Sequence, residues 1–559
     1  MPTPRRHFLI SGASAALAVV GCRPGAEPPT APGGFVGPNW ERGHALRDAT
    51  GGLASKSGTA PQPTVTRRVH TLIAGGGVAG LAAARALRHK GVDDFALLEL
   101  EDQPGGNARA GQLGGLPCPL GAHYLPVPSD RAPHVQNLLE ELGLRQRVAG
   151  RWTYDERHLC HSPQERLYFQ GQWQAGLLPV DGVGARTLAH YRQFAQAVQR
   201  VQQASAYAIP IPKWPLTLDQ IELDAIAFDA WLSAQGLTDP HLRWYLDYCC
   251  RDDYGAGLAT VSAWAGLHYF AARHGFTAPG DDAPEAEPVL TWPEGNGWLT
   301  ARLAAPLGDR LKTGQVVQRI EPIRNGVAVL ALNTATGQQE RWLAQRCVVA
   351  LPIFVAARVV VNAPAPLQLA LQDAAGTVRY APWVVTNLYL NRPLADRGGA
   401  APAWDNVVYP GGHEGPEGEA GAHTSQNGGL GYVNASHQNL SPVPGPAVLT
   451  HYRALGDQPI TRLQLLSHPW THWRDLTVAD LHGAHPELAS RLANVSVARY
   501  GHAMSMPTPG FMKKMGAYRS TVFNSSLSIS SSLNFAHSDW AGYSVFEEAF
   551  TMGHMAGGV

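Results

Sequence analysis

Three glycines with the spacing G-x-G-x-x-G, namely Gly75, Gly77 and Gly80, follow an apolar run, and a carboxylate, Glu99, comes 19 residues after the last of them. Between a strand and a helix, such glycines permit a tight turn, let the backbone approach a pyrophosphate and let the helix lie close on the strand. The helix then points free N–H groups at the phosphates. A carboxylate at the end of the next strand accepts hydrogen bonds from ribose hydroxyls. The pattern predicts a bound dinucleotide.

Three short elements must position these groups. The run Val69–Ala74 is apolar and rich in β-branched residues, which is typical of a buried parallel strand. Leu81–Lys90 is rich in Ala, Leu and Arg and predicts a helix that ends at Gly91. Phe95–Glu99 predicts the second strand, and the segment 224–232 has the apolar spacing of a helix. The order strand, helix, strand indicates an α/β fold.

Several segments resemble motifs of the flavin amine oxidase and phytoene desaturase superfamily. Glu99 opens a stretch similar to E-x-x-x-x-x-G-G-R, with Gly105 and Gly106 in place and Asn107 where the family usually has arginine. Arg109, two residues later, is a candidate to supply that charge. The other similar segments are residues 119–125, which correspond to the family segment beside the isoalloxazine ring, residues 292–298, 317–320 and 347–352, and the last flavin motif at residues 534–543.

The resemblance implies FAD as the cofactor. It also implies an α/β fold in which a Rossmann-type FAD-binding domain is interleaved with a mixed sheet-and-helix (α+β) substrate domain. The FAD-binding domain would take residues 67–150, 285–360 and 485–559, and the substrate domain would take residues 151–284 and 361–484. The residues expected at FAD are Gly75, Gly77, Val78, Ala79, Gly80, Glu99, Leu100, Gly105, Gly106, Asn107, Arg109, Gly121, Ala122, His123, Val317, Asp539, Gly542 and Tyr543.

The reaction shared by these families removes a hydride equivalent from a substrate carbon to flavin N5. Amine oxidases of the family usually add a lysine on a substrate-domain strand and two aromatic rings that flank the amine. The corresponding strand here, Trp383–Leu390, has no lysine, and only Tyr543 of the two rings is present because Ala503 takes the other place. The resemblance therefore leaves three hypotheses open: an amine or polyamine oxidase, a desaturase or dehydrogenase of an isoprenoid or other apolar substrate, and a flavoprotein that serves as a scaffold without turnover.

Six residues are candidates for the catalytic site of a small-molecule substrate. His502 stands where some monoamine oxidases bond a cysteine to FAD; it could act as a base, contact the flavin or be joined to it, or be a histidine hydrogen-bonded in the interface. His123 and Tyr124 would pack on the flavin ring, with proton transfer as the alternative. Asp252 or Asp253 would meet a cationic substrate, in a segment where Asp247 and Arg251 have the i, i+4 spacing of an ion pair. Tyr543 completes the set.

The amino-acid composition limits the kinds of partner that the protein is expected to bind. Lys plus Arg (44) equals Asp plus Glu (44), so the basic excess expected of a nucleic-acid-binding protein is absent. Six cysteines in 559 residues do not make a disulfide scaffold, and no metal site is predicted from the histidine and cysteine spacings. The sequence does not determine the oligomeric state.

The N-terminus has the features of an export signal. Arg5 and Arg6 precede an apolar stretch, in an order that resembles the twin-arginine signal, and Cys22 closes a sequence that resembles the lipobox of bacterial lipoproteins. We therefore expect residues 1–22 to engage the twin-arginine export machinery and the mature protein to lie on the periplasmic side, anchored to the membrane through lipidated Cys22. Residues 23–66, rich in Pro, Gly, Ala, Ser and Thr, predict a flexible linker.

Overall fold

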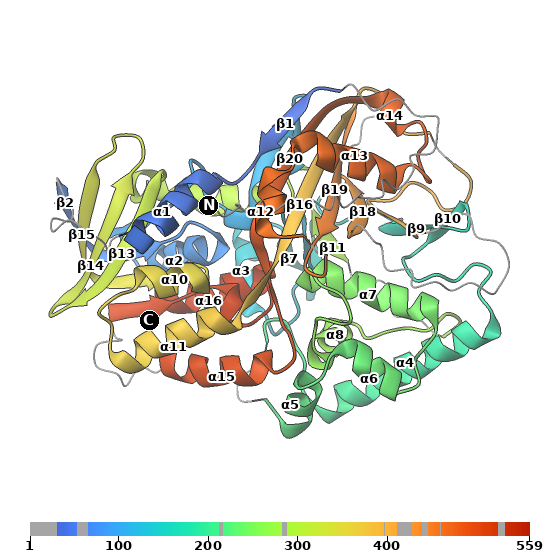
Figure 1. Ribbon diagram of the computed structural model, residues 1–559, viewed down its shortest axis with the longest axis horizontal. Coiled ribbons are helices and arrows are strands. Elements are labelled where there is room, and N and C mark those ends of the chain that lie inside the picture. The colour runs from blue at the N-terminus through green and yellow to red at the C-terminus, as the bar shows by residue number, and fades with distance from the viewer. Residues whose placement is uncertain are drawn as a thin grey trace, which may run out of the picture.

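The computed structural model describes residues 31–52, 65–211, 216–281, 288–395, 397–410, 428–438, 445–458, 460–523 and 532–558. The predicted signal, with Arg5, Arg6 and Cys22, lies outside the described residues. Two sheets form the frame of the molecule, and a group of helices, α4 to α8, lies below the second sheet (Figure 1). The fold is α/β, as predicted. Within the described residues, no helix is long and apolar enough to cross a membrane.

The first sheet carries the predicted dinucleotide unit. Its strand order is β12-β3-β2-β15-β14-β13, with β21 also paired to β15. The pairs that involve β2 and β3 are parallel, as are β15 with β2 and with β21, whereas β13, β14 and β15 are antiparallel. The strands are β2 (Val65–Ala74), β3 (Phe95–Leu98), β12 (Leu311–Lys312), β13 (Gln315–Ile323), β14 (Gly326–Asn333), β15 (Gln339–Val349) and β21 (Leu533–Phe535).

Parallel pairing brings the carboxyl ends of four strands to one edge of this sheet. Ala74 pairs with Leu98 of β3 and with Val349 of β15, and Val349 pairs in turn with Phe535 of β21. Ligands of open α/β sheets bind in the crevice outside such ends. The residues that follow these strands, beginning with Gly75, therefore converge on one site.

Helices cover this sheet and meet at the dinucleotide unit. Helix α16 packs along α2, and Gly553 has no room for a side chain because an added Cβ would collide with the carbonyl of Ala79. The 3-10 turns of this part are η1 (Gly106–Ala108), η2 (Ala305–Arg310) and η4 (Ser538–Trp540). Its helices are α1 (Trp40–Gly52), α2 (Val78–His89), α3 (Pro133–Glu141), α9 (Gly297–Ala304), α10 (Ile353–Val359), α11 (Ala365–Thr377), α15 (Phe511–Val522) and α16 (Phe546–Gly558).

The second sheet is 8-stranded in the described part of the chain, with the order β1-β20-β16-β19-β18-β17-β9-β10. Its strands are β1 (Gly33–Val36), β9 (Glu165–Phe169), β10 (Gln172–Ala175), β16 (Arg379–Leu390), β17 (Asp405–Val408), β18 (Gly429–Asn434), β19 (Ala447–Ala454) and β20 (Leu492–Met506). Helices α12 (Arg462–Ser467), α13 (Trp470–Leu481) and α14 (Leu488–Arg491) lie beside it.

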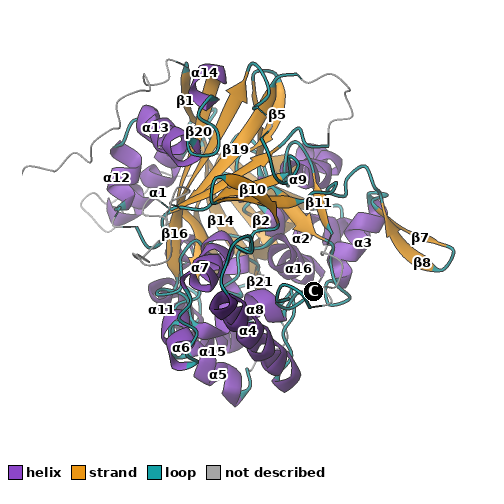
Figure 2. Ribbon diagram, turned by 90° about the vertical axis from the view of Figure 1, so that its right-hand side faces the viewer, coloured by secondary structure: helices purple, strands orange, loops and turns teal. Residues whose placement is uncertain are grey.

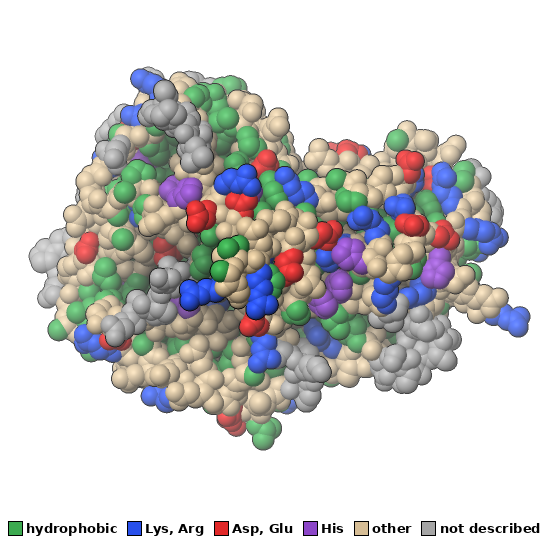
Figure 3. All heavy atoms as spheres, turned by 180° about the vertical axis from the view of Figure 1, so that it is seen from behind, with side chains coloured by type: hydrophobic (Ala, Val, Ile, Leu, Met, Phe, Trp, Pro, Cys, Tyr) green, Lys and Arg blue, Asp and Glu red, His purple; other side chains and the backbone are tan. Residues whose placement is uncertain are grey.

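The helices below this sheet are α4 (Ala185–Ala204), α5 (Leu218–Asp224), α6 (Phe228–Ala234), α7 (Pro240–Tyr254) and α8 (Ala263–Ala271). Short pairs complete the fold, β4 (Ala110–Leu113) with β5 (Leu116–Pro119), β6 (Tyr124–Pro126) with β11 (Val289–Thr291), and β7 (Arg145–Val148) with β8 (Arg151–Tyr154). The β7–β8 hairpin projects from the body (Figure 2). Acidic and basic side chains are interspersed over the face in Figure 3.

Three sequence predictions differ from this fold. Residues 33–52, predicted as linker, form β1 and α1. Residues 492–506, predicted within the FAD-binding domain, form β20 of the second sheet, where they pair with β16 and β1. The helix suggested by residues 224–232 is divided, because α5 ends at Asp224 and α6 begins at Phe228. Distant parts of the chain supply these contacts: β20 pairs with β1 and β16, and the N–H of Phe228 at the start of α6 donates to the carbonyl of Val261 at 2.9 Å.

Candidate active site

The glycine turn has the geometry that binds a pyrophosphate. Gly75 has φ +100°, and a Cβ there would collide with the carbonyl of Ala350. A Cβ on Gly80 would collide with the carbonyl of Gly75, so this glycine lets α2 lie against the turn. At Gly77 the nearest atom to an added Cβ is 4.0 Å away, which leaves the approach open. No side chain caps α2 at Gly77, so its first N–H groups are free to bind an anion.

Glu99 lies directly against this turn. One carboxylate oxygen accepts the N–H of Gly76 at 2.6 Å, and the other accepts the N–H of Glu101 at 2.9 Å. Burial raises the pKa of Glu99, whereas these two backbone N–H groups act to lower it. The buried carboxylate therefore has a fixed orientation beside the phosphate-binding turn, which fits the position of an adenosine ribose.

The segments expected along the rest of the cofactor are tied to one another. Asn107 donates from its side chain to the carbonyl of Ala503 at 2.8 Å, and its own carbonyl accepts the N–H of Ala122 at 2.9 Å. A Cβ on Gly121 would collide with that same carbonyl. Arg109 is buried, with its Nε donating to the carbonyl of Gly106 at 3.0 Å. Asn107 thus holds the backbone at Ala503 and Ala122 in place. The guanidinium of Arg109 supplies a positive charge in this region.

Asp539 is held by groups of the protein itself. Its carboxylate accepts the N–H of Ile353 at 3.0 Å and the hydroxyl of Tyr380 at 2.6 Å, and lies 3.2 Å from Nδ1 of His537. The His537 and Tyr380 contacts favour the ionised form and hold the pKa of Asp539 below its ordinary value in spite of burial. Asp539 therefore joins η4 to α10 and β16 at the crevice, and its contact with the cofactor stays a prediction. Val317 is buried on β13.

His502 lies near Asp539, and its contacts with the described residues include two aromatic rings. Its imidazole stacks on Phe354 with centroids 4.4 Å apart and meets Tyr380 edge-on at 5.6 Å. Although the residue is solvent-accessible, packing around its ring and the nearby Arg462 lower the pKa of His502 to about 4. The imidazole is therefore neutral at neutral pH.

His123 and Tyr124 belong to an aromatic cluster with Tyr452 of β19 and with Trp404, which precedes β17. The His123 ring stacks on Tyr452 with centroids 4.4 Å apart, and Tyr124 meets Trp404 edge-on at 5.7 Å. The Tyr452 hydroxyl donates to the carbonyl of Gly121 at 2.9 Å. Burial lowers the pKa of His123 to about 3. Because the His123 imidazole is neutral and stacked, it is better suited to pack on the flavin ring than to exchange protons near pH 7.

Tyr543 is fixed by an ion pair between Asp253 of α7 and Arg273, which follows α8. Its hydroxyl donates to Asp253 at 2.5 Å, and Arg273 reaches both the Tyr543 oxygen at 2.5 Å and Asp253 at 3.0 Å. Asp253 therefore does meet a cation, but the cation is Arg273 of the same chain. Asp247 and Arg251 form the predicted i, i+4 pair at 2.8 Å. Sequence reasoning missed Arg273, since no motif surrounds it.

Three further carboxylates gather next to this group. Asp405 of β17 pairs with Glu165 of β9, so their side chains lie opposite each other on one face. Asp252 lies close to both, and burial together with Asp253 raises the pKa of Asp252 to about 7. Burial and Asp252 also raise the pKa of Asp405. Asp405 accepts a hydrogen bond from the backbone of Asn406, and His274 lies near Glu165. Arg273 and Arg251 act on Asp252 through space and partly oppose the rise of its pKa.

The sequence was compared with protein-family models. Residues 78–463 match the model described as flavin-containing amine oxidoreductase. The chain belongs to this family. Its members carry a flavin and are oxidoreductases, and the glycine turn and Glu99 fit FAD as the cofactor.

Curated relatives and solved structures agree with the family assignment. A coproporphyrinogen III oxidase of Mycobacterium leprae is 43% identical over 98 residues, which are 17% of this chain and 20% of that protein. A putative flavin-containing monoamine oxidase of Mycobacterium tuberculosis is 25% identical over 307 residues, 55% of this chain and 62% of the relative. The alignments thus span less than two thirds of these relatives.

Two amine oxidases have similar structures. Putrescine oxidase, solved with putrescine, aligns with a TM-score of 0.63 at 16% identity, over 88% of this chain and 98% of its own. Cyclohexylamine oxidase from Brevibacterium oxydans aligns with a TM-score of 0.61 at 16% identity and the same coverage. At these identities the likeness establishes that this flavoprotein shares their fold.

Proposed function

We propose that this flavoprotein oxidises an amine, and among amines one with a second cationic group, such as a diamine or polyamine. The observation that carries the proposal is Asp252, a carboxyl that makes no ion pair with the described residues and lies beside the Asp253–Arg273–Tyr543 group, with Asp253 and Glu165 as like-charged neighbours. A partly buried carboxylate beside other carboxylates is costly to ionise, and a cationic substrate would reduce that cost. An apolar substrate would leave it in place.

Glu165 and Asp405 support a second cationic group. Like charges directly opposite each other on neighbouring strands destabilise a sheet, and these two carboxylates occupy opposite positions in the β9–β17 register. A second ammonium between Asp252 and this pair would balance the charge. The site would then recognise a substrate by its separated cations and exclude an uncharged one.

Each remaining residue has a definite task in this proposal. FAD, when bound, supplies the acceptor of the hydride equivalent. The Gly75–Gly80 turn would hold its pyrophosphate and Glu99 its ribose. Arg273 and Asp253 hold the Tyr543 ring in one orientation, and neutral His123 provides a wall without a competing positive charge. With no lysine on β16, the position of the amine would depend on Asp252 and Tyr543.

We also propose that the protein is exported by the twin-arginine pathway and anchored through Cys22. The support is the order Arg5, Arg6, apolar stretch and cysteine. That pathway carries folded proteins, which suits a protein that takes up its cofactor before export. Membrane fractionation of the full-length protein and of Cys22→Ser tests the anchor. The proposal expects the parent in the membrane fraction and the variant in the soluble fraction.

The test of function is an anaerobic titration of the purified holoenzyme with monoamines, diamines and polyamines, followed by the flavin absorbance. Bleaching by a diamine or polyamine at lower concentration than by a monoamine of equal length supports the proposal. Bleaching only by an isoprenoid would favour a desaturase. If no amine or isoprenoid reduces the flavin, the scaffold hypothesis gains instead.

A further inference from the structure

The N-terminal strap, which we define as residues 33–42, joins the second sheet to the cofactor side of the molecule (Figure 1). Its first part, β1, is an edge strand parallel to β20, with Gly33 opposite Val495 and Val36 opposite Ala498. Only glycine fits at position 33, because an added Cβ would collide with the Val495 carbonyl and lie 2.7 Å from the Trp470 ring. The strap is therefore docked at a defined register.

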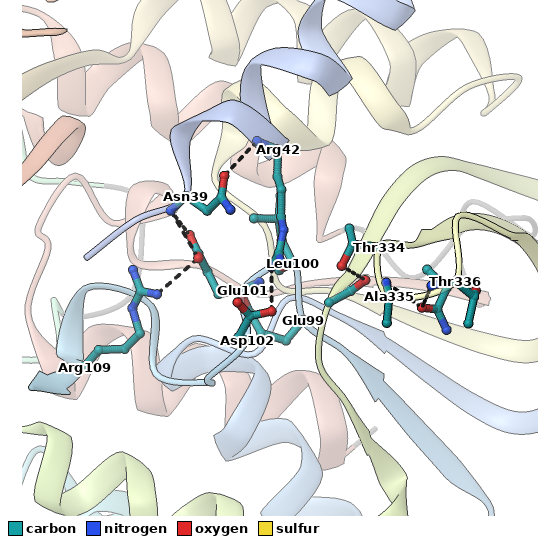
Figure 4. A network of polar contacts seen from close by, with 12 residues as sticks. Asn39, Arg42, Glu99, Leu100, Glu101, Asp102, Arg109, Thr334, Ala335 and Thr336 are labelled. Atoms are coloured by element: carbon teal, nitrogen blue, oxygen red, sulfur yellow. Dashed lines mark hydrogen bonds and ion pairs between the residues drawn. The ribbon is translucent and has the colours of Figure 1, made fainter. Parts of the chain in front are cut away.

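The other end of the strap contacts the loop that follows Glu99 (Figure 4). The N–H of Asn39 donates to the Glu101 carboxylate at 2.9 Å. The Arg42 guanidinium donates to the carbonyl of Leu100 at 3.0 Å and to Asp102 at 2.9 Å. The Asn39 side chain accepts the N–H of Arg42 at 3.1 Å, which caps α1 and holds Arg42 over the loop.

This loop carries the carboxylate expected at the ribose. The N–H of Glu101 donates to Glu99 at 2.9 Å, and the Glu101 carboxylate lies 3.4 Å from Arg109. On its inner side, Glu99 accepts the N–H of Gly76. The loop Glu99–Asp102 is thus fixed by the glycine turn and by the strap, in addition to backbone hydrogen bonds with the segment 312–315, where the N–H of Glu99 donates to the carbonyl of Lys312 at 2.9 Å.

The strap itself has little apolar burial. Phe35 is 38% exposed and Trp40 is 41% exposed, although Arg499 lies over the Phe35 ring at 3.5 Å. A segment held mainly by edge pairing and polar contacts detaches at a lower free energy than the core unfolds. Detachment would release Glu101 and Leu100 and remove the edge strand β1, while the first sheet and the other strands of the second sheet stay paired.

We propose that the strap is a positioning element for FAD: it keeps the Glu99–Asp102 loop in the conformation that binds the cofactor, and FAD leaves when the strap detaches. This adds Asn39 and Arg42 to the residues that act on the cofactor, through Glu101 and Leu100. It also makes cofactor retention depend on a strand, β1, that belongs to the other sheet.

Two neighbouring glycines provide a matched test in the holoenzyme. Gly33→Ala should displace β1, whereas Gly34→Ala should not, because a Cβ at position 34 meets nothing within 4 Å. We expect Gly33→Ala to speed hydrogen exchange of the peptide that covers residues 99–102 by about fivefold or more, and to speed FAD release in parallel. Gly34→Ala should match the parent. Hydrogen exchange gives an answer even where the flavin is covalently held.

Arg42 provides a second, independent variant. Arg42→Ala should also speed exchange in the loop, by about fivefold or more, since it loses a charge-assisted bond. Arg42→Lys keeps a charge opposite Asp102 and should fall between parent and Arg42→Ala. The control is Arg157→Ala, which breaks the exposed pair with Asp155 at 2.6 Å, away from both the strap and the loop. Equal exchange in the loop for Gly33→Ala, Arg42→Ala and their controls would overturn the proposal.

Discussion

At the scale of single residues, the chemistry of the proposed site depends on Asp252. Its pKa of about 7 means that its charge changes within the physiological range. An ammonium placed beside the carboxyl favours the ionised form, so binding of a cationic substrate should release a proton at pH 7. Affinity for the amine should therefore rise as pH increases through about 7.

Asp252→Asn tests this directly. The variant keeps the size of the side chain but has no charge, so we expect kcat/KM for a diamine to fall by about 10-fold or more, the effect of losing a buried charge-assisted bond. The rise of kcat/KM with pH near 7 should also disappear. Asp373→Asn, an exposed carboxylate on α11, is the control. An unchanged pH profile in Asp252→Asn would remove this residue from the site.

Arg273 illustrates a different residue-level effect. The Arg273–Asp253 pair is buried, and removing only the cation leaves an uncompensated carboxylate. Arg273→Met should therefore lower the free energy of unfolding by about 3–5 kcal/mol. The double variant Arg273→Met with Asp253→Leu should recover most of this loss. Urea unfolding measures both, and a double variant no more stable than the single one would contradict the ion-pair explanation.

At the scale of elements, the close packing of α16 on α2 predicts that the same glycine-to-alanine change has opposite effects on stability in two helices. Gly553→Ala puts a Cβ against the Ala79 carbonyl, so we expect a loss of about 1–3 kcal/mol of unfolding free energy. Gly376→Ala makes the same change in α11, where a Cβ meets nothing within 4 Å, and should stabilise by about 0.5–1 kcal/mol. Thermal unfolding should therefore shift in opposite directions for the two variants.

The elements also show what the sequence could predict. The strand at 69–74, the helix at 81–90 and the second strand lie within or close to β2, α2 and β3, because their signals are local: β-branched runs, glycine spacing and helix formers. The strap was predicted as linker since its Pro and Gly content masks a strand whose partner, Val495, is far along the chain. Glu165 and Asp405 were missed for the same reason, as only the register of β9 and β17 brings them together.

At the scale of the whole molecule, Glu548 joins the two parts of the protein. It lies on α16, and its carboxylate accepts the N–H of Ile211, which lies between α4 and α5 in the group of helices α4 to α8. Burial raises the pKa of Glu548 to about 7. The folded protein therefore binds a proton here at pH values where the unfolded chain, with an ordinary pKa of about 4.3, has released it.

The sign of the resulting pH effect follows from this difference. Stability contributed by protonated Glu548 is present below about pH 4.3 and is lost as pH rises toward 7, up to about 4 kcal/mol. Comparing Glu548→Gln with the parent isolates this group, because the other titrating groups, including Asp252, are common to both proteins. We expect the variant to gain stability relative to the parent between pH 5 and pH 8 in urea unfolding, since glutamine keeps the bond to Ile211 without ionising. A constant difference across that range would mean that Glu548 stays ionised in the folded protein. The bond to Ile211 would then be accepted by a carboxylate and not by a neutral carboxyl.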